Sequence, residues 1–205
     1  MDHDVTSLRG RRADARINRL SMGDLFERIR WSEPDRVVLT GVAGAVENPA
    51  HQSLTAAQAD DLANRHANAM LAAGVSPGEI AMMVCGNSVE GVIAKIGMAK
   101  AAITAAPINP NLAPDVVREL LALTGARSAI VDAEFLPKFA PIFEQEGVRI
   151  VHPIAVGGAL PSGYADFHQF TRDASTVEPE MTIHGDDIWQ ILFTSGTSAT
   201  PKGVM

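Results

Sequence analysis

The sequence predicts an α/β fold with a layered, mainly parallel sheet flanked by helices. Apolar strand segments alternate with amphipathic helical segments along the chain, at the spacing of βαβ units. Residues 80–84 form a continuous apolar run, the pattern of a strand that is covered on both faces. Hydrophobic residues make up 46% of the 205-residue chain and charged residues 20%, so a packed core is expected.

Capping residues mark the first two helices. Ser21 can cap a short helix that Pro34 ends. Thr55 and Gln58 have the spacing of a capping box at the start of a longer helix, whose apolar residues recur every three or four positions. Gly74 stands where the C-terminal cap of this longer helix belongs.

Two further helices follow. Ser88 can cap the first of them, Pro114 lies near the start of the second, and Gly125 is placed to end it. Short apolar and β-branched runs between the helices predict the strands. The predicted strands comprise residues 36–40, 80–84, 103–106, 129–131, 148–151 and 188–194.

The chain is expected to divide into a polar N-terminal arm, residues 1–20, and one α/β unit, residues 21–205. Within that unit, residues 41–49 contain turn formers, and residues 155–187 are expected to form an irregular connection rich in Gly, Pro, Ser and acidic residues. The arginines of the arm are dispersed and no apolar stretch follows them, so the arm does not resemble a signal peptide. Lysines interrupt the longest apolar stretch, so no transmembrane segment is expected.

Composition restricts the kinds of partner. A net charge of −7 argues against nucleic acid as a partner, because phosphate backbones require a basic surface. Cys85 is the only cysteine, which excludes an intrachain disulfide and suits a cytoplasmic protein. Within its apolar run, Cys85 is expected to be an inert core residue rather than a nucleophile. Homo-oligomerisation is left open.

The spacing of possible ligands predicts no metal site. Asp186 and Asp187 precede the last predicted strand, and we expect them to form a solvated turn rather than a metal pair. The other candidates are histidines without metal-ligand spacing, for which packing or surface roles are expected. These histidines are His51, His66, His152, His168 and His184.

The most distinctive stretch is FTSGTSATPKG, residues 193–203, at the end of the last predicted strand. Gly196 and Gly203 would let a ligand approach the backbone, and Lys202 supplies a compact positive charge. With backbone N–H groups and five hydroxyl side chains, they predict an anion cradle suited to a polyphosphate, although a polar surface linker is the alternative. A Walker A loop is excluded, because Pro201 and Gly203 replace its second Gly and its Ser or Thr. The hydroxyl groups come from Thr194, Ser195, Thr197, Ser198 and Thr200.

Residues 193–203 resemble the signature loop of the adenylate-forming, or AMP-binding, enzymes, which is usually (Y/F)-T-S-G-(S/T)-T-G-x-P-K-G. Residues 54–64 are similar to the early L-T-Y-x-E-L…A-N helix of this superfamily, and residues 98–110 to its L-K-A-G…P-L-N-P segment. Three motifs in the right order are far more specific than one loop. The sequence looks most like acyl-CoA synthetases, the fatty-acid–CoA ligases, and would be the N-terminal part of the large domain of such an enzyme.

The resemblance implies an ATP-dependent acid–thiol ligase of fatty acid metabolism. Such an enzyme joins a small-molecule carboxylic acid, here expected to be a fatty acid, to ATP with release of pyrophosphate, and then usually passes the acyl group to coenzyme A. ATP, Mg²⁺ and coenzyme A are the implied cofactors, and Lys202 is the implied catalytic residue. The implied cofactor-binding residues are Thr194, Ser195, Gly196, Thr197, Ser198, Lys202 and Gly203.

The sequence also departs from the family pattern. Ser198 and Ala199 replace Thr and Gly in the loop, and Ala102 replaces the Gly of the middle segment. If position 199 requires a positive φ, its Ala costs roughly 1 kcal/mol. The later motifs of the family are absent, so we expect the N-terminal portion of a longer enzyme, inactive by itself. An acyl-AMP ligase, an amino-acid adenylation domain and a non-catalytic nucleotide-binding fragment are the alternatives.

Overall fold

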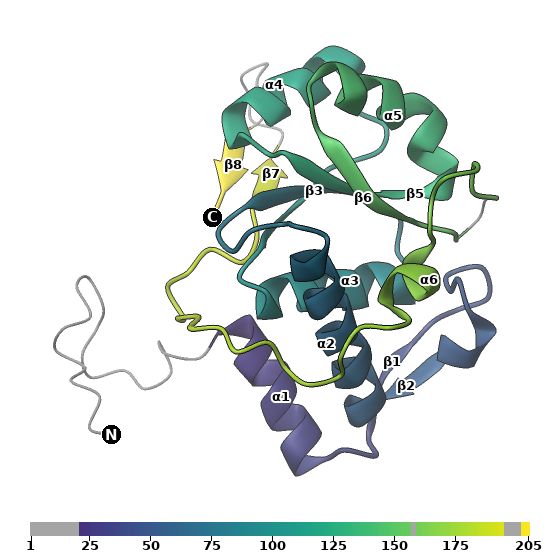
Figure 1. Ribbon diagram of the computed structural model, residues 1–205, viewed down its shortest axis with the longest axis vertical. Helices are drawn as coiled ribbons and strands as arrows, with labels where there is room; N and C mark the ends of the chain where they lie inside the picture. The colour runs from purple at the N-terminus through teal and green to yellow at the C-terminus, as the bar shows by residue number, and fades with distance from the viewer. Residues whose placement is uncertain (1–20, 157–158, 195–201) are drawn as a thin grey trace, which may run out of the picture.

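A computed structural model describes residues 21–156, 159–194 and 202–205, and its centre is a four-stranded parallel sheet (Figure 1). The strands lie in the order β4-β3-β5-β6, and every neighbouring pair is parallel, which confirms the predicted α/β fold. The four strands are β3 (Ile80–Val84), β4 (Thr104–Pro107), β5 (Ser128–Asp132) and β6 (Arg149–Ile154). The predicted polar arm, residues 1–20, lies outside the described residues.

Helices cover both faces of this sheet (Figure 1). Met82 and Val84 of β3 belong to the core under α4 and α5, whereas Ala81 and Met83 belong to the core shared with α2 and α3. Successive side chains of a strand point to opposite faces, so a strand covered on both faces is apolar throughout. The helices are α1 (Met22–Ser32), α2 (Ala56–Ala72), α3 (Val89–Lys100), α4 (Pro114–Thr124), α5 (Leu136–Gln145) and α6 (Phe167–Thr171).

Two small antiparallel pairs, β1 with β2 and β7 with β8, accompany the main sheet. The predicted strand at residues 188–194 is wrong in extent, because only its C-terminal end forms β7. Before β7, the chain follows β4 with a single parallel bridge between Gln190 and Ala105. The bounds of the smaller elements are β1 (Val37–Thr40), β2 (Ser53–Thr55), β7 (Leu192–Thr194), β8 (Lys202–Val204), and the 3-10 helices η3 (Pro49–His51) and η4 (Ala133–Phe135).

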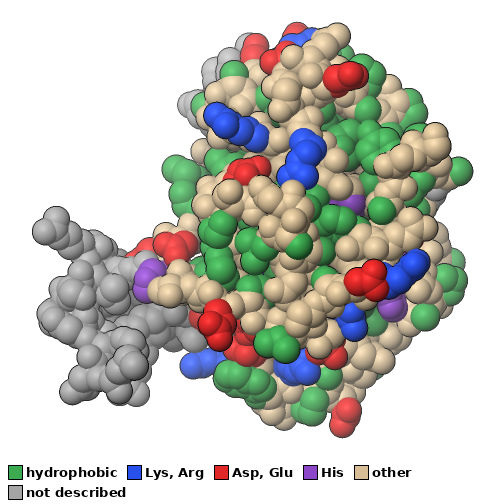
Figure 2. Space-filling view, in the orientation of Figure 1, with side chains coloured by type: hydrophobic (Ala, Val, Ile, Leu, Met, Phe, Trp, Pro, Cys, Tyr) green, Lys and Arg blue, Asp and Glu red, His purple; other side chains and the backbone are tan. Residues whose placement is uncertain are grey.

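The surface carries charges of both signs. On the face seen in Figure 2, acidic and basic side chains are interspersed with apolar ones and do not gather into a broad basic area. Among the described helices, none combines the length and the apolar character that crossing a membrane requires.

The predicted helix caps are present. Ser21 and Thr55 each form a capping box with the residue three positions later. Ser88 Oγ accepts a backbone N–H from the first turn of α3 at 3.0 Å. Gly74 follows the end of α2 with φ +83°, and Gly125 ends α4 with φ +65°, the left-handed conformation that glycine adopts without steric cost.

Two helices, α5 and α6, were not predicted from the sequence. α5 contains Pro137 and Pro141, and proline in a helix interior removes a hydrogen bond. Pro137 lies in the first turn, where its missing N–H costs nothing, and Phe139 and Phe143 bury the inner face of the helix in the core. α6 lies within the segment expected to be irregular, and Asp166 caps its start.

A buried ion pair fixes the helices on one side of the sheet. Lys100, the last residue of α3, has a fully buried side chain whose Nζ lies 2.8 Å from Asp60 Oδ1 of α2 and 3.0 Å from Glu178 Oε1. Arg30 of α1 reaches Asp60 Oδ2 at 3.0 Å. Because a buried charge is tolerated only when it is paired, these contacts couple three helices to the segment that contains Glu178.

Replacing Lys100 with Met should lower the free energy of unfolding by about 3–5 kcal/mol, because the buried Asp60 carboxylate loses its closest partner. The double variant Lys100→Met/Asp60→Leu should recover part of this loss, since apolar side chains can replace a buried ion pair. Urea denaturation followed by circular dichroism measures both. The control Lys138→Met alters an exposed lysine and should cost less than about 1 kcal/mol. An equally small cost for Lys100→Met would contradict the assigned role.

The turn after α3 places an alanine in a left-handed conformation. Ala102 has φ +55°, and no other non-glycine residue in the described ranges has a positive φ. Its N–H donates to the Ala99 carbonyl at 3.3 Å, and the Ile103 N–H donates to the Met98 carbonyl at 2.8 Å. These two bonds form a Schellman motif with Ala102 at the position that usually holds glycine. The family's L-K-A-G segment has glycine at this position, where it adopts the left-handed conformation without steric cost.

The substitution Ala102→Gly should raise the free energy of unfolding by up to about 1 kcal/mol, because it removes the steric cost of a Cβ at positive φ. Ala101 is the matched control, since it precedes Ala102 and has an ordinary φ of −91°. Ala101→Gly should destabilise the protein instead. Urea denaturation of the two variants distinguishes them, and a loss of stability in Ala102→Gly would refute the explanation.

Candidate functional site

The β7–β8 hairpin frames the loop that is predicted to bind a polyphosphate. Thr194 and Lys202 are register partners, so the stretch between them joins two paired strand ends. The predicted site residues Thr194, Lys202 and Gly203 therefore come together on this hairpin. The other predicted site residues lie outside the described residues; they are Ser195, Gly196, Thr197 and Ser198.

The main sheet sets the direction of this hairpin. The Ala105 N–H of β4 donates to the Trp189 carbonyl, and the Ile191 N–H donates back to the Ala105 carbonyl, both at 2.9 Å. Lys95 Nζ of α3 lies 4.9 Å from the centre of the Trp189 ring, which holds the same segment from the helix side. Because the segment runs parallel to β4, β7 continues toward the carboxyl edge of the sheet. Ligands of open α/β sheets bind at that edge.

Gly203 has a packing role within the hairpin. A Cβ at this position would lie 3.1 Å from Ile191 Cγ2 and 3.7 Å from the Phe193 ring. Phe193 itself packs against the core under α4 and α5. The sequence predicts a role for Gly203 in ligand approach, and the structure adds that the side chains of Ile191 and Phe193 leave little room for a larger residue.

Cys85 and Asp132 lie at the carboxyl ends of β3 and β5. A pocket of about 180 Å³ opens beside Cys85, with Ser88 and Pro107 in its lining. Burial raises the pKa of the Cys85 thiol well above its ordinary value, and the nearby Asp132 carboxylate raises it further. A thiol with a raised pKa is a poor nucleophile, so these surroundings support the predicted inert role of Cys85. Asp132 Oδ2 accepts the Gly86 N–H at 2.6 Å, and burial raises its pKa to about 6.

Comparison with known proteins identifies the family of this chain. The model of the family described as AMP-binding enzyme matches residues 26–205. The chain belongs to this family. It is 32% identical over 181 residues to the long-chain-fatty-acid–CoA ligase FadD13 of Mycobacterium tuberculosis, an alignment that covers 88% of this chain and 35% of the relative. It is 31% identical over 161 residues to the 3-hydroxybenzoate–CoA/4-hydroxybenzoate–CoA ligase of Thauera aromatica, covering 76% of this chain and 30% of the relative.

A solved structure also resembles this member of the family. The anthranilate CoA ligase AuaEII in complex with anthranoyl-AMP matches it with a TM-score of 0.74 and 29% sequence identity. The match covers 91% of this chain and 34% of that structure. The chain thus spans about a third of the length of the relatives that it matches. The parallel sheet flanked by helices is the part that they share.

Two of the three motifs that resemble the family have structural roles in this chain. Residues 54–64 enter α2, and residues 98–110 run from the end of α3 through β4. Asp60 comes from the first motif and Lys100 from the second, and they form the buried ion pair. A Cβ on Gly97, just before the second motif, would lie 2.7 Å from a carbonyl oxygen of α2. These motifs therefore hold α2 against α3, which carries the chain to β4.

Two histidines that are distant in the sequence face each other in the core. His66 Nε2 of α2 lies 3.0 Å from His152 Nε2 of β6. His152 Nδ1 lies 3.0 Å from the Pro153 carbonyl, which can only accept, so the His152 proton is on Nδ1 and His152 Nε2 accepts from His66. His66 Nδ1 then has no partner among the described residues. Burial lowers the pKa of both imidazoles, that of His152 to about 4.

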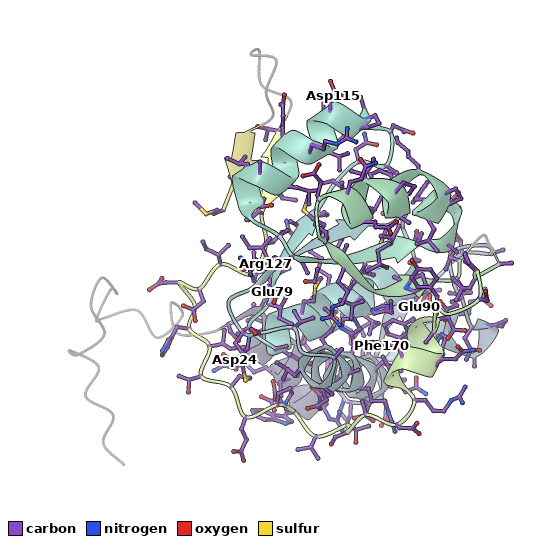
Figure 3. The ribbon with its side chains drawn as sticks, turned by 45° about the horizontal axis from the view of Figure 1, so that its top comes forward. Asp24, Glu79, Glu90, Asp115, Arg127 and Phe170 are labelled. Carbon is purple, nitrogen blue, oxygen red and sulfur yellow. The ribbon has the colours of Figure 1, made fainter. Side chains whose placement is uncertain are left out.

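α6 closes over this histidine pair. The Phe167 ring stacks on His66 with 5.6 Å between ring centres, and the Phe170 ring stacks on His152 at 4.5 Å. Figure 3 shows Phe170 on the same side of the molecule as Glu90, away from Glu79 and Arg127. The pair is therefore sealed by aromatic rings, which explains why its charged form is disfavoured.

Stability should fall as the pH drops from about 6.5 to about 4. In this range the unfolded histidines bind protons, whereas the folded His66 and His152 stay neutral, so acid favours unfolding by up to about 1.4 kcal/mol per pH unit for each. The variant His152→Gln should flatten this dependence when urea unfolding is measured across the range. His184→Gln is the control, because His184 lies outside the cluster, and should keep the slope of the parent protein. An unchanged slope in His152→Gln would contradict the assignment.

The sequence analysis also missed a second group. His51, His168 and Glu90 come from three separate segments, and their ligand atoms lie within 4.8 Å of one another. Their spacing in sequence gave no signal, because the irregular connection that carries His168 folds back over the start of α3 (Figure 1). The expected solvated turn at Asp186 and Asp187 is exposed, and Asp187 Oδ2 accepts the His184 N–H at 2.7 Å.

Proposed function

We propose that the whole protein is an ATP-dependent acid–thiol ligase that activates a carboxylic acid as its adenylate and transfers the acyl group to coenzyme A. One observation carries the proposal: the signature-loop sequence joins β7 to β8, and the segment before β7 runs parallel to β4 toward the carboxyl edge of the sheet. Membership of the AMP-binding enzyme family supports it. Residues 21–205 would supply the N-terminal α/β part of the AMP-binding domain, with residues 1–20 as a polar arm.

The proposed reaction has two steps. An oxygen of the substrate carboxylate attacks the α-phosphorus of MgATP, the bond to the β-phosphate breaks, and pyrophosphate leaves. The thiol sulfur of coenzyme A then attacks the acyl carbonyl carbon, the thiol proton passes to solvent, and AMP leaves with the electrons of the broken acyl–oxygen bond. The first step needs no general base, because a carboxylate is already ionised at neutral pH.

The loop residues would act on the leaving pyrophosphate. Negative charge develops on the β- and γ-phosphates as the bond breaks, so positioned donors and one cation lower the barrier. The donors would be the backbone N–H groups and hydroxyls of Thr194, Ser195, Thr197 and Ser198, and Lys202 would supply the cation. Gly196 and Gly203 would allow the phosphates to approach the backbone. Mg²⁺ bound to ATP would share the charge.

A fatty acid is the proposed substrate. The relative FadD13 is named for long-chain fatty acids, whereas the Thauera aromatica relative is named for hydroxybenzoates and AuaEII for anthranilate. The experiment is therefore pyrophosphate release by the whole protein with fatty acids of increasing length, hydroxybenzoates and anthranilate, each with and without coenzyme A. Release with fatty acids and formation of acyl-CoA supports the proposal. Release with aromatic acids alone would show that the substrate is an aromatic acid. No release with any acid would refute the ligase activity.

In the whole protein, Lys202→Ala should reduce the rate of adenylate formation by about 100-fold or more, by analogy with the loss of one preorganised oxyanion partner. Lys202→Arg should retain part of the rate, since it keeps the charge but changes its geometry. The exposed Lys138 provides the control Lys138→Ala, which should leave the rate unchanged. ATP–pyrophosphate exchange measures this step alone. A Lys202→Ala rate equal to that of the parent would remove Lys202 from the mechanism.

A further inference from the structure

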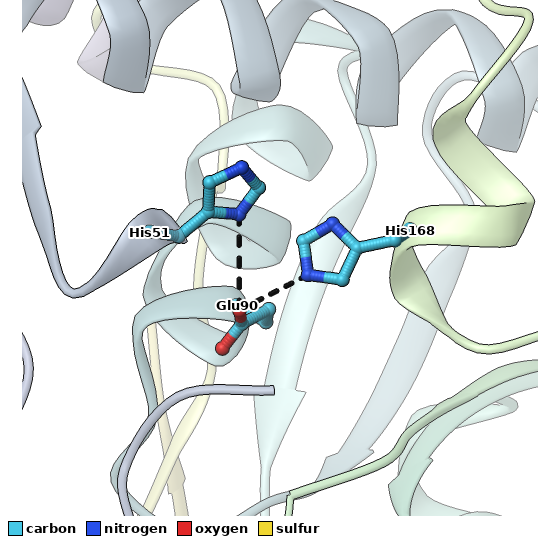
Figure 4. A group of neighbouring side chains, drawn as sticks. All are labelled: His51, Glu90 and His168. Atoms are coloured by element: carbon cyan, nitrogen blue, oxygen red, sulfur yellow. Dashed lines mark hydrogen bonds and ion pairs between the residues drawn. The ribbon is translucent and has the colours of Figure 1, made fainter. Parts of the chain in front are cut away.

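Two histidines and a glutamate converge at one point beside the start of α3. His51 comes from η3, Glu90 from the first turn of α3 and His168 from α6. His168 Nε2 lies 3.2 Å from Glu90 Oε1, and His51 Nδ1 lies 3.9 Å from the same oxygen. Figure 4 shows both imidazoles directed at this carboxylate.

The separations of the two imidazole nitrogens from Glu90 Oε1 are close to the edge length of a tetrahedral coordination site. Zinc binds imidazole nitrogen and carboxylate oxygen at about 2.0–2.2 Å, so neighbouring ligand atoms of a tetrahedron lie roughly 3.3–3.6 Å apart. The observed separations to Glu90 Oε1 are 3.2 Å and 3.9 Å. A further carboxylate oxygen, Glu47 Oε1, lies 3.5 Å from His168 Nε2.

The cluster has unused binding capacity. Glu90 is 1% exposed, and the backbone N–H groups of Glu47 and Asn48 donate to its two oxygens and fix their direction. His51 Nδ1 is buried and has no hydrogen-bond partner among the described residues, since its distance to Glu90 is too long for a hydrogen bond. A buried imidazole nitrogen without a partner carries a desolvation cost that a bound cation would remove.

We propose that His51 Nδ1, His168 Nε2 and Glu90 Oε1 bind a divalent transition-metal ion of the zinc type, with Glu47 beside the fourth position. Two imidazoles and a carboxylate are a ligand set for zinc rather than for Mg²⁺ or Ca²⁺, which prefer oxygen ligands throughout. The site is separate from the β7–β8 hairpin and has no part in the proposed ligase reaction. Its consequence is structural, because one ion would tie η3 and α6 to the start of α3.

The proposal is tested by titrating the whole protein, freed of metal by a chelator and without nucleotide, with ZnCl₂ in a calorimeter. The protein should bind one equivalent of Zn²⁺ with high affinity through this cluster. Zn²⁺ should also raise the melting temperature, because a ligand that binds only the folded state stabilises it. His51→Ala and His168→Ala should each weaken this binding by about 100-fold or more, and Glu47→Gln by about 10-fold. His184→Ala is the matched control, which removes a described histidine outside the cluster and should leave zinc binding unchanged.

A ligand exchange distinguishes a metal site from a cluster of hydrogen bonds. His168→Cys removes the hydrogen bond to Glu90 but supplies a thiolate, which is itself a zinc ligand. Recovery of Zn²⁺ binding in His168→Cys relative to His168→Ala, with both variants folded by circular dichroism, supports the site. Co²⁺ bound to His168→Cys should show thiolate-to-metal absorption. Zinc binding that is equal in the parent protein, His51→Ala and His168→Ala, or absent from all, would overturn the proposal.

Discussion

The buried pairing of Lys100 with Asp60 is the constraint on which the rest of the structure depends. An ammonium group with no exposed surface must be paired, so α3 can end only where α2 presents Asp60 and the later chain presents Glu178. Arg30 adds α1 to the same carboxylate. The lack of a Cβ at Gly97 lets α2 and α3 approach closely enough for the pair to form. Electrostatics and packing thus specify the same helix arrangement.

The residues that follow Lys100 in the chain connect this ion pair to the candidate site. Lys100 is followed by the left-handed turn at Ala102, which reverses the chain into β4. β4 then provides the backbone groups to which the segment before β7 binds. The hairpin direction is therefore set by α3 and β4, although neither contributes a residue to the loop. A family motif can therefore position the predicted loop without being part of it.

The connection formed by residues 155–187 also positions other elements through its side-chain contacts. Its short helix α6 supplies the aromatic rings that seal His66 and His152 and the imidazole that meets Glu90. Segments with little regular structure can be fixed by such side-chain contacts, because each contact replaces hydration that burial has removed. Glu178, farther along this connection, contacts Lys100, so the connection is held at a second point.

The sequence by itself determined the parallel sheet, its flanking helices and the family. Capping residues, apolar periodicity and motif order are local, and local signals survive in a single sequence. The sequence did not predict α5, where apolar packing overrides Pro141. It also did not predict the length of β7, which depends on a partner strand. The meeting of His51 with His168, and of His66 with His152, was decided only by tertiary structure. Such contacts join residues far apart in the chain, and only the packing of the intervening elements brings them within reach.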